Sequence, residues 1–277
     1  MNLGKLRYKI SHKFPALRIP RRVLYAMSYY NKKYPLIIKW GFNSKETANY
    51  TYDLTERNIL YLAATISVVT SVNRDRILDY INEARNDKAL REHILNETKK
   101  SPFKEYADLR VDFGKRMGWY AFARALKPKV IVETGVDKGM GSVLLCAALL
   151  RNREEGFEGR FFGTDINPAA GYLLSGPYSQ MGKILYGDSI QTLLQFNDKI
   201  DLFINDSDHS SEYEYREYMT IKDKMNAGGI ILGDNSHDTD KLAIFSFETN
   251  RNFLFFSEEP RGHWYPGAGI GISYASI

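Results

Sequence analysis

Three oxygen-bearing side chains follow two short apolar segments of the sequence, and their chemistry is suited to a metal ion. Asp206 comes directly after the run 200–205, and Asp234 and Asn235 come shortly after the run 229–232. If these runs are adjacent parallel strands, their carboxyl ends bring the three side chains to one place. Carboxylate and amide oxygens are preferred ligands of Mg²⁺ and related divalent ions. The sequence predicts such a site, the alternative being turn residues and helix caps.

Two further segments end in acidic residues that are suited to a nucleoside. Asp165 lies at the end of the run 160–166, and Asp188 and Ser189 follow the run 183–186. A carboxylate at the first position can accept two hydrogen bonds from the vicinal hydroxyls of a ribose. The second pair is suited to an adenine amino group. Each alone is more often a helix cap or a turn residue, but at successive strand ends they favour a nucleoside ligand.

A glycine-rich segment, 133–142, follows another apolar run, 130–134. Its glycines permit a tight turn and close backbone approach to a ligand, and the helix expected after it directs its positive end toward the turn. The spacing differs from the three-glycine dinucleotide pattern, which disfavours a nicotinamide cofactor. A plain strand-to-helix turn is the alternative interpretation.

Asp208 and His209 stand beside the predicted metal site, and we take them as the catalytic candidates. A neutral imidazole is a competent general base near neutral pH. A purely structural histidine next to an aspartate is the alternative.

The elements that must position these residues are predicted by a regular alternation of β-rich and helical stretches after Pro128. The early β-rich runs are almost continuously apolar, as in a parallel sheet covered by helices on both faces. The last two runs are joined by a connection too short for a crossover helix, so they should pair antiparallel. The expected strands are 130–134, 160–166, 183–186, 200–205, 229–232, 252–257 and 268–274. This pattern predicts an α/β fold with a doubly wound, seven-stranded, mostly parallel sheet.

Three regions are expected along the chain: a basic arm over 1–50, a helical region over 51–114, and the α/β domain over 115–277. The apolar run 59–72 of the helical region is too short to span a bilayer and is predicted to be a buried helix. The whole fold is therefore expected to be a Rossmann-like sheet domain with an N-terminal helical extension.

Composition places the chain among globular proteins, with 44% hydrophobic and 26% charged residues in 277. Cys146 is the one cysteine, so an intrachain disulfide is excluded. No apolar core of signal-peptide length occurs in Met1–Ile10. These features predict a cytoplasmic protein in a reducing compartment.

Basic charge is concentrated at the N-terminal end. Residues 1–45 hold eleven of the 38 Lys and Arg residues and none of the 33 Asp and Glu residues, so the remainder carries a net charge of −6. Aromatic residues such as Trp40 are interleaved with these cations, which suits nucleic acid or anionic lipid. Packing on the chain's own acidic domain or on a second subunit, as in a homo-oligomer, stays open, as does an organelle transit peptide. No specific nucleic-acid partner is predicted.

In their order along the chain, these motifs resemble those of class I S-adenosylmethionine-dependent methyltransferases, over about the last 150 residues. The motifs are 133–142, Asp165, 187–188, 200–209 and 228–235. The residues after the fourth and fifth strands resemble the metal-dependent O-methyltransferases of the catechol and caffeoyl-coenzyme A type. They are also similar to bacterial relatives that methylate sugars of macrolides and polysaccharides.

The resemblance implies S-adenosylmethionine as cofactor, together with Mg²⁺ or another divalent ion. It places Gly135 and Gly139 under the methionine part, Glu133 near its amino group, and Asp165 on the ribose. The implied cofactor residues are Glu133, Gly135, Gly139, Ser142, Asp165, Asp188, Ser189 and Asp206. His209 stands where several plant-type members have a lysine base, so the base and the substrate stay open.

The expected function is Mg²⁺-assisted O-methylation of a hydroxyl on a small molecule or glycan, in natural-product or polysaccharide biosynthesis. Because fold alone does not establish activity, two alternatives stay open. One is a non-catalytic module that binds a nucleoside or docks through the basic arm. The other is a hydroxylase-like enzyme on the same fold.

Overall fold

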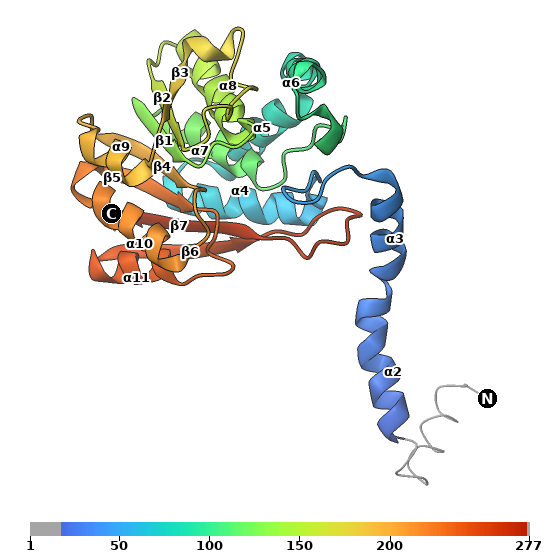
Figure 1. Cartoon of the computed structure of the whole chain (residues 1–277). Helices are drawn as coiled ribbons and strands as arrows, with labels where there is room; N and C mark the ends of the chain where they lie inside the picture. Colours follow the sequence, from blue (N-terminus) through green and yellow to red (C-terminus); the bar gives the residue numbers. More distant parts are fainter. Residues whose placement is uncertain (1–17, 276–277) are drawn as a thin grey trace. The chain divides into compact units, whose positions relative to one another are not determined.

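The computed structural model describes residues 18–275, which divide into two compact units (Figure 1). The smaller unit holds the described residues up to Ser44 together with Gly262–Tyr265. The larger unit holds Lys45–Arg261 and the segment from Pro266 onward. All predicted site residues therefore lie in the larger unit, whereas the described part of the basic arm lies mostly in the smaller one.

A seven-stranded sheet in the order β3-β2-β1-β4-β5-β7-β6 forms the centre of the larger unit. The first five strands are parallel, and β7 runs antiparallel to both β5 and β6. This confirms the predicted doubly wound, mostly parallel sheet with an antiparallel final pair. The strands are β1 (Val130–Thr134), β2 (Arg160–Asp165), β3 (Gly182–Tyr186), β4 (Ile200–Asn205), β5 (Met225–Gly233), β6 (Arg251–Ser257) and β7 (Gly269–Ala275).

Helices cover both faces of this sheet (Figure 1). The α-helices of the larger unit are α4 (Glu56–Thr70), α5 (Arg74–Asn86), α6 (Lys88–Lys100), α7 (Arg116–Leu126), α8 (Met140–Glu154), α9 (Ser189–Gln195), α10 (Ser211–Ile221) and α11 (Lys241–Glu248). Short 3-10 turns occur at η2 (Lys104–Tyr106), η3 (Tyr178–Gln180) and η4 (Lys222–Lys224). The smaller unit contains α2 (Arg18–Asn31) and α3 (Tyr34–Asn43).

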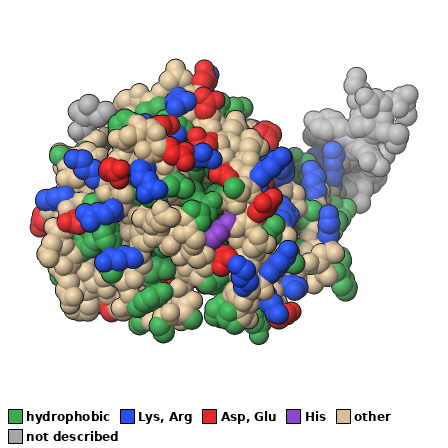
Figure 2. Space-filling view, turned by 90° about the horizontal axis from the view of Figure 1, so that it is seen from above, with side chains coloured by type: hydrophobic (Ala, Val, Ile, Leu, Met, Phe, Trp, Pro, Cys, Tyr) green, Lys and Arg blue, Asp and Glu red, His purple; other side chains and the backbone are tan. Residues whose placement is uncertain are grey.

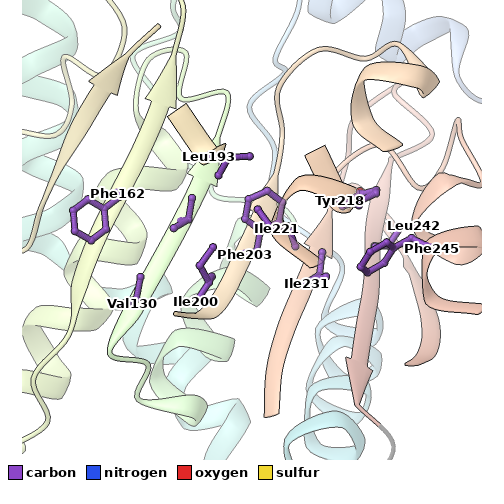
Figure 3. Packing of buried hydrophobic residues seen from close by; sticks show 11 residues of the cluster. Val130, Phe162, Leu193, Ile200, Phe203, Tyr218, Ile221, Ile231, Leu242 and Phe245 are labelled. Carbon is purple, nitrogen blue, oxygen red and sulfur yellow. The ribbon is translucent and has the colours of Figure 1, made fainter. Parts of the chain in front are cut away.

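One hydrophobic core lies between the sheet and the helices α9, α10 and α11 (Figure 3). Val130 and Val132 belong to it, whereas the buried Ile131 between them does not, because successive side chains of a strand point to opposite faces. The core comprises Val130, Val132, Phe162, Leu193, Ile200, Phe203, Tyr218, Ile221, Ile231, Leu242 and Phe245. It holds β1, β2, β4 and β5 side by side, with their carboxyl ends aligned.

Helix α7 packs against α4, α5 and α8. Near its C-terminal end the Arg124 side chain is 2% exposed and ties three helices together. It donates to Glu83 of α5 over 2.8 Å and pairs with Glu155, just after α8, over 2.5 Å. In α8, Cys146 is fully buried, which raises the pKa of its thiol well above the usual value.

The helices of the region before α7 begin at side chains that cap them. Thr55, Asn73 and Asp87 accept hydrogen bonds from backbone amides in the first turns of α4, α5 and α6, which satisfies donors that a helix start leaves unpaired. Tyr80 and Ile81 of α5 are buried, in keeping with the helical periodicity expected there. Within residues 18–275, no helix is long and apolar enough to cross a membrane.

Candidate functional site

A cavity of about 540 Å³ opens at the carboxyl ends of β3, β2, β1 and β4. In open α/β sheets this edge is where ligands bind, because the loops and helix starts after the strands converge there. The lining also includes residues from before α7, among them Thr51, Asp112 and Arg116, and Tyr213 from α10. The cavity is therefore built by the sheet on one side and by the N-terminal helical region on the other.

Most of the predicted site residues meet at this cavity. Eight line it: Glu133, Gly135, Asp165, Asp188, Ser189, Asp206, Asp208 and His209. The other four, Gly139, Ser142, Asp234 and Asn235, lie behind the lining. The strand-end argument thus brings together residues that are up to 76 positions apart in the sequence.

Gly135 makes the turn after β1 possible. Its φ is +77°, and a Cβ at this position would lie 1.9 Å from the backbone oxygen of Asp206. Any other residue would therefore clash with the loop after β4, and its backbone would be strained as well. Gly139 also has a positive φ, +94°, at the N-cap of α8, but it does not line the cavity.

Asp165 lines the cavity and also stabilises the turn that follows Gly135. Its Oδ2 accepts hydrogen bonds from the backbone amides of Val136 and Asp137, at 3.0 and 2.9 Å. Its Oδ1 accepts one from Asn167 at 2.8 Å. Because a carboxylate offers about four lone-pair positions, one remains on Oδ1 for a ligand hydroxyl. This bracing of the turn was not expected from the sequence.

Glu133 is a buried carboxyl group that lines the cavity. Burial raises its pKa to about 8, although Ser142 and Arg116 oppose the rise. Ser142 Oγ donates to Glu133 Oε2 over 2.6 Å, so Ser142 acts behind Glu133 and does not face the cavity. Burial disfavours the anionic form of Glu133. The positive charge of a ligand ammonium group at this position would stabilise that form.

Asp188 and Ser189 lie on the β3 side of the cavity, at the start of α9. Asp188 caps that helix by accepting from the amide of Gln191 at 2.8 Å. Tyr213 of α10 donates its hydroxyl to Asp188 at 2.9 Å, and the same hydroxyl lies 2.9 Å from Ser189 Oγ. Tyr213 is a cavity residue that the sequence did not reveal, because it follows the β4 motif by several positions inside an ordinary helix.

A buried glutamate, Glu217 of α10, ties the strand ends together and was also not expected. It is fully buried, and it accepts hydrogen bonds from Ser207 at 2.6 Å and from Thr134 at 3.3 Å, and further ones from Asn205 and Ser189. These partners come from the ends of β1 and β4 and from the start of α9. Glu217 therefore holds in register the loops that form the cavity.

The predicted metal ligands Asp206 and Asp234 each have a cationic partner. Lys115 Nζ lies 2.7 Å from Asp234 Oδ1, and Arg116 lies 3.5 Å from Asp206 Oδ2. Burial would raise the pKa of Asp234, but the two cations outweigh it and the pKa is lowered. Burial and the neighbouring Asp234 together raise the pKa of Asp206 well above its usual range.

The third predicted ligand is engaged as well. The Oδ1 atom of Asn235 lies 2.5 Å from Nδ1 of His209, while Asn235 itself is 1% exposed. If Nδ1 carries the proton, it donates to Asn235 and leaves a lone pair on Nε2. His209 is exposed and lines the cavity, and Asp208 beside it accepts from the amide of Ser210 at 2.7 Å, which lowers the pKa of Asp208.

These pairings do not fit a divalent ion. Each predicted ligand already has a partner, and two of the partners are cations whose charge a metal ion would oppose. Within residues 18–275, no cluster of three or more His, Cys, Asp or Glu side chains is arranged to hold a metal. The metal site at Asp206, Asp234 and Asn235 thus stays a prediction that this arrangement does not support.

Comparison with known families agrees with the site. Residues 132–236 match the model of a family described as a methyltransferase domain. This match begins in β1 and ends just after β5, so it contains the four strand ends that form the cavity. No curated protein matches the chain in a sequence search.

Solved structures of methyltransferases are similar to the chain, and the first of those below shares its fold. The SAH-bound methyltransferase PaMTH1 of Podospora anserina is 20% identical, with 73% of this chain and 95% of that chain covered and a TM-score of 0.50. The O-methyltransferase TomG of Streptomyces achromogenes, in complex with SAM, is 14% identical, with coverage of 69% and 91% and a TM-score of 0.47. An O-methyltransferase of Bacillus cereus, in complex with SAH, is 11% identical, with coverage of 69% and 92% and a TM-score of 0.45.

The sheet order and the family match together indicate that the larger unit contains a methyltransferase domain that includes residues 132–236. The match over residues 132–236 agrees with the resemblance to S-adenosylmethionine-dependent methyltransferases seen in the motifs.

Proposed function

We propose that the chain methylates a hydroxyl oxygen of a small-molecule or glycan acceptor. The observation that carries the proposal is that one cavity is lined both by strand-end carboxylates suited to a nucleoside and by a histidine. We name the part at Asp165 and Asp188 the donor half, and the part at Asp208 and His209 the acceptor half. A donor and an acceptor held in one cavity react as if in a single molecule, which lowers the entropic part of the barrier.

The donor half has the groups that S-adenosylmethionine requires. Gly135, which lines the cavity without a side chain, would lie against the methionine part, and the buried Glu133 carboxylate would pair with its ammonium group. Asp165 Oδ1 accepts from a ribose hydroxyl, and Asp188 and Ser189 lie on the adenine side. When bound, S-adenosylmethionine supplies a methyl carbon whose bond to sulfur breaks, leaving the electron pair on sulfur, as a bond to the acceptor oxygen forms.

The acceptor half is polar, which favours a hydroxyl-bearing substrate. Asn49, Thr51 and Asp112 line it from non-helical segments before α7, and Arg116 lines it at the start of α7. Side chains of this kind donate to and accept from hydroxyl groups, so they suit an alcohol, a phenol or a sugar. The region before α7 thereby contributes to substrate recognition.

His209 is the base that removes the acceptor proton. Its Nδ1 contact with Asn235 fixes the ring and leaves the other ring nitrogen to accept the proton. Asp208 is exposed beside it and contributes negative charge at the same edge of the cavity. Assistance by Mg²⁺ is left out of this mechanism, because the oxygens that would bind the ion already have partners.

Two measurements test the proposal. Calorimetric titration of the full chain with S-adenosylhomocysteine should show one site, and Asp165→Asn should weaken it, whereas Asp198→Asn, at an exposed position, should not. Incubation with S-adenosylmethionine and a panel of catechols and sugars should then release S-adenosylhomocysteine, and His209→Asn should lower the rate about 100-fold or more.

Other outcomes favour the other candidates. Absence of binding to both nucleosides would support a docking module without a cofactor. Binding together with an oxidised acceptor in place of a methylated one would support a hydroxylase-like reaction.

A further inference from the structure

Two basic residues stand at the start of α7, where the helix itself disfavours them. Lys115 is its N-cap, Arg116 is its first residue, and the first turn contains no acidic residue. The N-terminal end of a helix carries partial positive charge, so a cation there loses about 0.3–1 kcal/mol compared with an anion. Lys115 is also only 6% exposed, which adds a desolvation cost. Something in the surroundings must offset both costs.

The offset comes from the carboxylates at the ends of β4 and β5. Lys115 Nζ lies 2.7 Å from Asp234 Oδ1 and also donates to the Asp234 backbone oxygen at 3.3 Å. The Lys115 backbone amide donates to Glu258 Oε1 at 2.7 Å, which fixes the start of the helix. Arg116 lies 3.5 Å from Asp206 Oδ2.

Arg116 retains a donor for a ligand. Its Nε is buried and makes no hydrogen bond within the described part of the chain, while the residue lines the cavity. A buried guanidinium donor without a partner costs free energy unless a bound group accepts from it. The acceptor half of the cavity is the place from which such a group can come.

We propose that Lys115 and Arg116 form a built-in cation pair that takes the place of a divalent ion. Lys115 neutralises Asp234 and has a structural role, whereas Arg116 donates from Nε to the acceptor oxygen and stabilises its negative charge. The role of Arg116 rests on the proposed methyl transfer. The claim that no divalent ion binds beside these residues does not.

Mn²⁺ titration followed by electron paramagnetic resonance tests that claim without any turnover. With S-adenosylhomocysteine present, the wild-type full chain should leave added Mn²⁺ free in solution. The Lys115→Met, Arg116→Met double variant exposes the aspartate oxygens and should bind Mn²⁺ about tenfold or more tightly than wild type. Arg160→Met, which removes an exposed cation paired with Asp198, is the matched control and should behave as wild type.

The wild-type result alone decides the question if the double variant does not fold. One bound Mn²⁺ per wild-type chain that Asp234→Asn abolishes would overturn the proposal. Calorimetry with S-adenosylhomocysteine on the same samples shows separately whether the cofactor site is intact, so a failure of the proposed function is recognised as such.

A second proposal rests on the smaller unit, where α2 presents an apolar face to solvent. Ile19, Val23, Met27 and Tyr30 recur at helical spacing and are 65%, 51%, 47% and 72% exposed. Arg18, Arg21 and Arg22 occupy other positions around the helix, and α2 contains no acidic residue. By contrast, Lys and Arg side chains are interspersed with Asp and Glu over the face of the larger unit in Figure 2.

Helix α3 continues this character. Ile38 and Phe42 are 61% and 88% exposed, and α3 also lacks acidic residues in its first turn. In the same unit, Trp40 packs edge to face against Trp264, and Lys33 donates to the Trp264 backbone oxygen at 2.9 Å. Cations, tyrosines and tryptophans combined with an exposed apolar face are the composition of helices that lie in a membrane interface.

We infer that α2 binds the surface of an anionic bilayer, with its apolar face in the acyl boundary and its arginines at the headgroups. Charge complementarity favours this occupant, because residues 1–45 contain eleven Lys or Arg residues and no Asp or Glu. A nucleic acid would use the cations but would leave Ile19, Val23 and Met27 in water.

Flotation of the full chain with vesicles tests the inference. Vesicles of phosphatidylcholine with phosphatidylglycerol should capture the chain, and vesicles of phosphatidylcholine alone should capture much less. Arg21→Gln with Arg22→Gln should weaken binding about 30-fold, and Val23→Ser with Met27→Ser should weaken it comparably. Leu60→Ser with Val68→Ser changes exposed apolar residues of α4 and is the matched control, with no effect expected.

Three results would overturn it. The first is absence of capture by anionic vesicles. The second is binding to duplex DNA without binding to vesicles. The third is a chain that fails to bind vesicles but forms a dimer that Val23→Ser with Met27→Ser dissociates in sedimentation.

Discussion

The two ends of α7 hold cations that pair with carboxylates and serve different purposes. At the C-terminal end, Arg124 is 2% exposed and contacts Glu83 and Glu155, and neither it nor its partners lines the cavity. At the N-terminal end, Arg116 pairs with Asp206 beside a cavity and keeps one donor without a partner. The first arrangement is complete within the protein, and the second is not.

The difference shows that burial of a charge does not by itself indicate a function. Arg124 is at a favourable helix end for a cation, since the C-terminal end carries partial negative charge. Arg116 is at the unfavourable end and faces an excess of carboxyl groups, with Asp206, Asp234 and Glu133 all raising its pKa against the effect of burial. Incomplete pairing in an accessible cavity distinguishes a site from a structural ion pair.

The largest expected effect is on stability and concerns the C-terminal end of α7. Arg124→Met should lower the free energy of unfolding by about 3 kcal/mol, because it leaves Glu83 and Glu155 without their shared partner. Urea denaturation measures this, and affinity for S-adenosylhomocysteine should stay unchanged. If the variant were as stable as wild type but bound the nucleoside poorly, the contrast between the two ends would be wrong.

At the cavity, Glu133→Gln should weaken S-adenosylhomocysteine binding about 30-fold, or about 2 kcal/mol. The reason is that the amide cannot form a charge-assisted hydrogen bond with the ligand ammonium group. Calorimetry measures the affinity. Adenosine, which lacks the ammonium group, is the control ligand and should bind both proteins equally, and a matching loss for adenosine would contradict the assignment.

The affinity should also depend on pH through Glu133, whose pKa is raised to about 8 by burial. The protonated carboxyl group cannot pair with an ammonium ion, so affinity should rise about fivefold from pH 7 to pH 8 and then level off. Titrations at several pH values measure this, and Glu133→Gln should remove the dependence. In the free protein the raised pKa of Glu133 also affects folding, but in the opposite direction. The stabilisation of the folded state by the protonated carboxyl group is fully present below pH 4.5 and is lost as pH rises through about 8.

The smallest expected effect is at the β3 side of the cavity. Tyr213→Phe removes the hydroxyl that donates to Asp188, so nucleoside affinity should fall about fivefold, or about 1 kcal/mol. Calorimetry with adenosine and with S-adenosylhomocysteine should give the same loss for both ligands, because each carries the base. A loss confined to S-adenosylhomocysteine would place the tyrosine elsewhere in the site.

Much of the fold was predictable because each strand is an apolar run whose end is marked by a polar residue. Asp165, Asp188 and Asp206 each follow such a run, and parallel strands bring their ends to one edge. The loops after β1 and β4 also lie against each other at Gly135, so the ends of these two strands are held together. Sequence order and sheet geometry together therefore located most of the cavity.

The partners of these residues were not predictable from the sequence. Lys115 and Arg116 precede β1, and in the sequence they resemble an ordinary charged helix start. Only the packing of α7 brings Lys115 to Asp234 and Arg116 to Asp206. Glu217 lies among charged and tyrosine residues of α10, a composition typical of a solvent-exposed helix face. Its burial follows from contacts with three separate segments, the ends of β1 and β4 and the start of α9, and local periodicity does not contain this information.

The burial of Cys146 in α8 has a practical consequence. Its thiol is inaccessible and poorly ionised, and it is the chain's one cysteine. A cysteine introduced on the exposed surface of α2, for example Ser28→Cys, would therefore be the one reactive thiol in the folded protein. Spin or fluorescent labels could be attached there without first removing native thiols, which makes the depth of this helix in a lipid bilayer directly measurable.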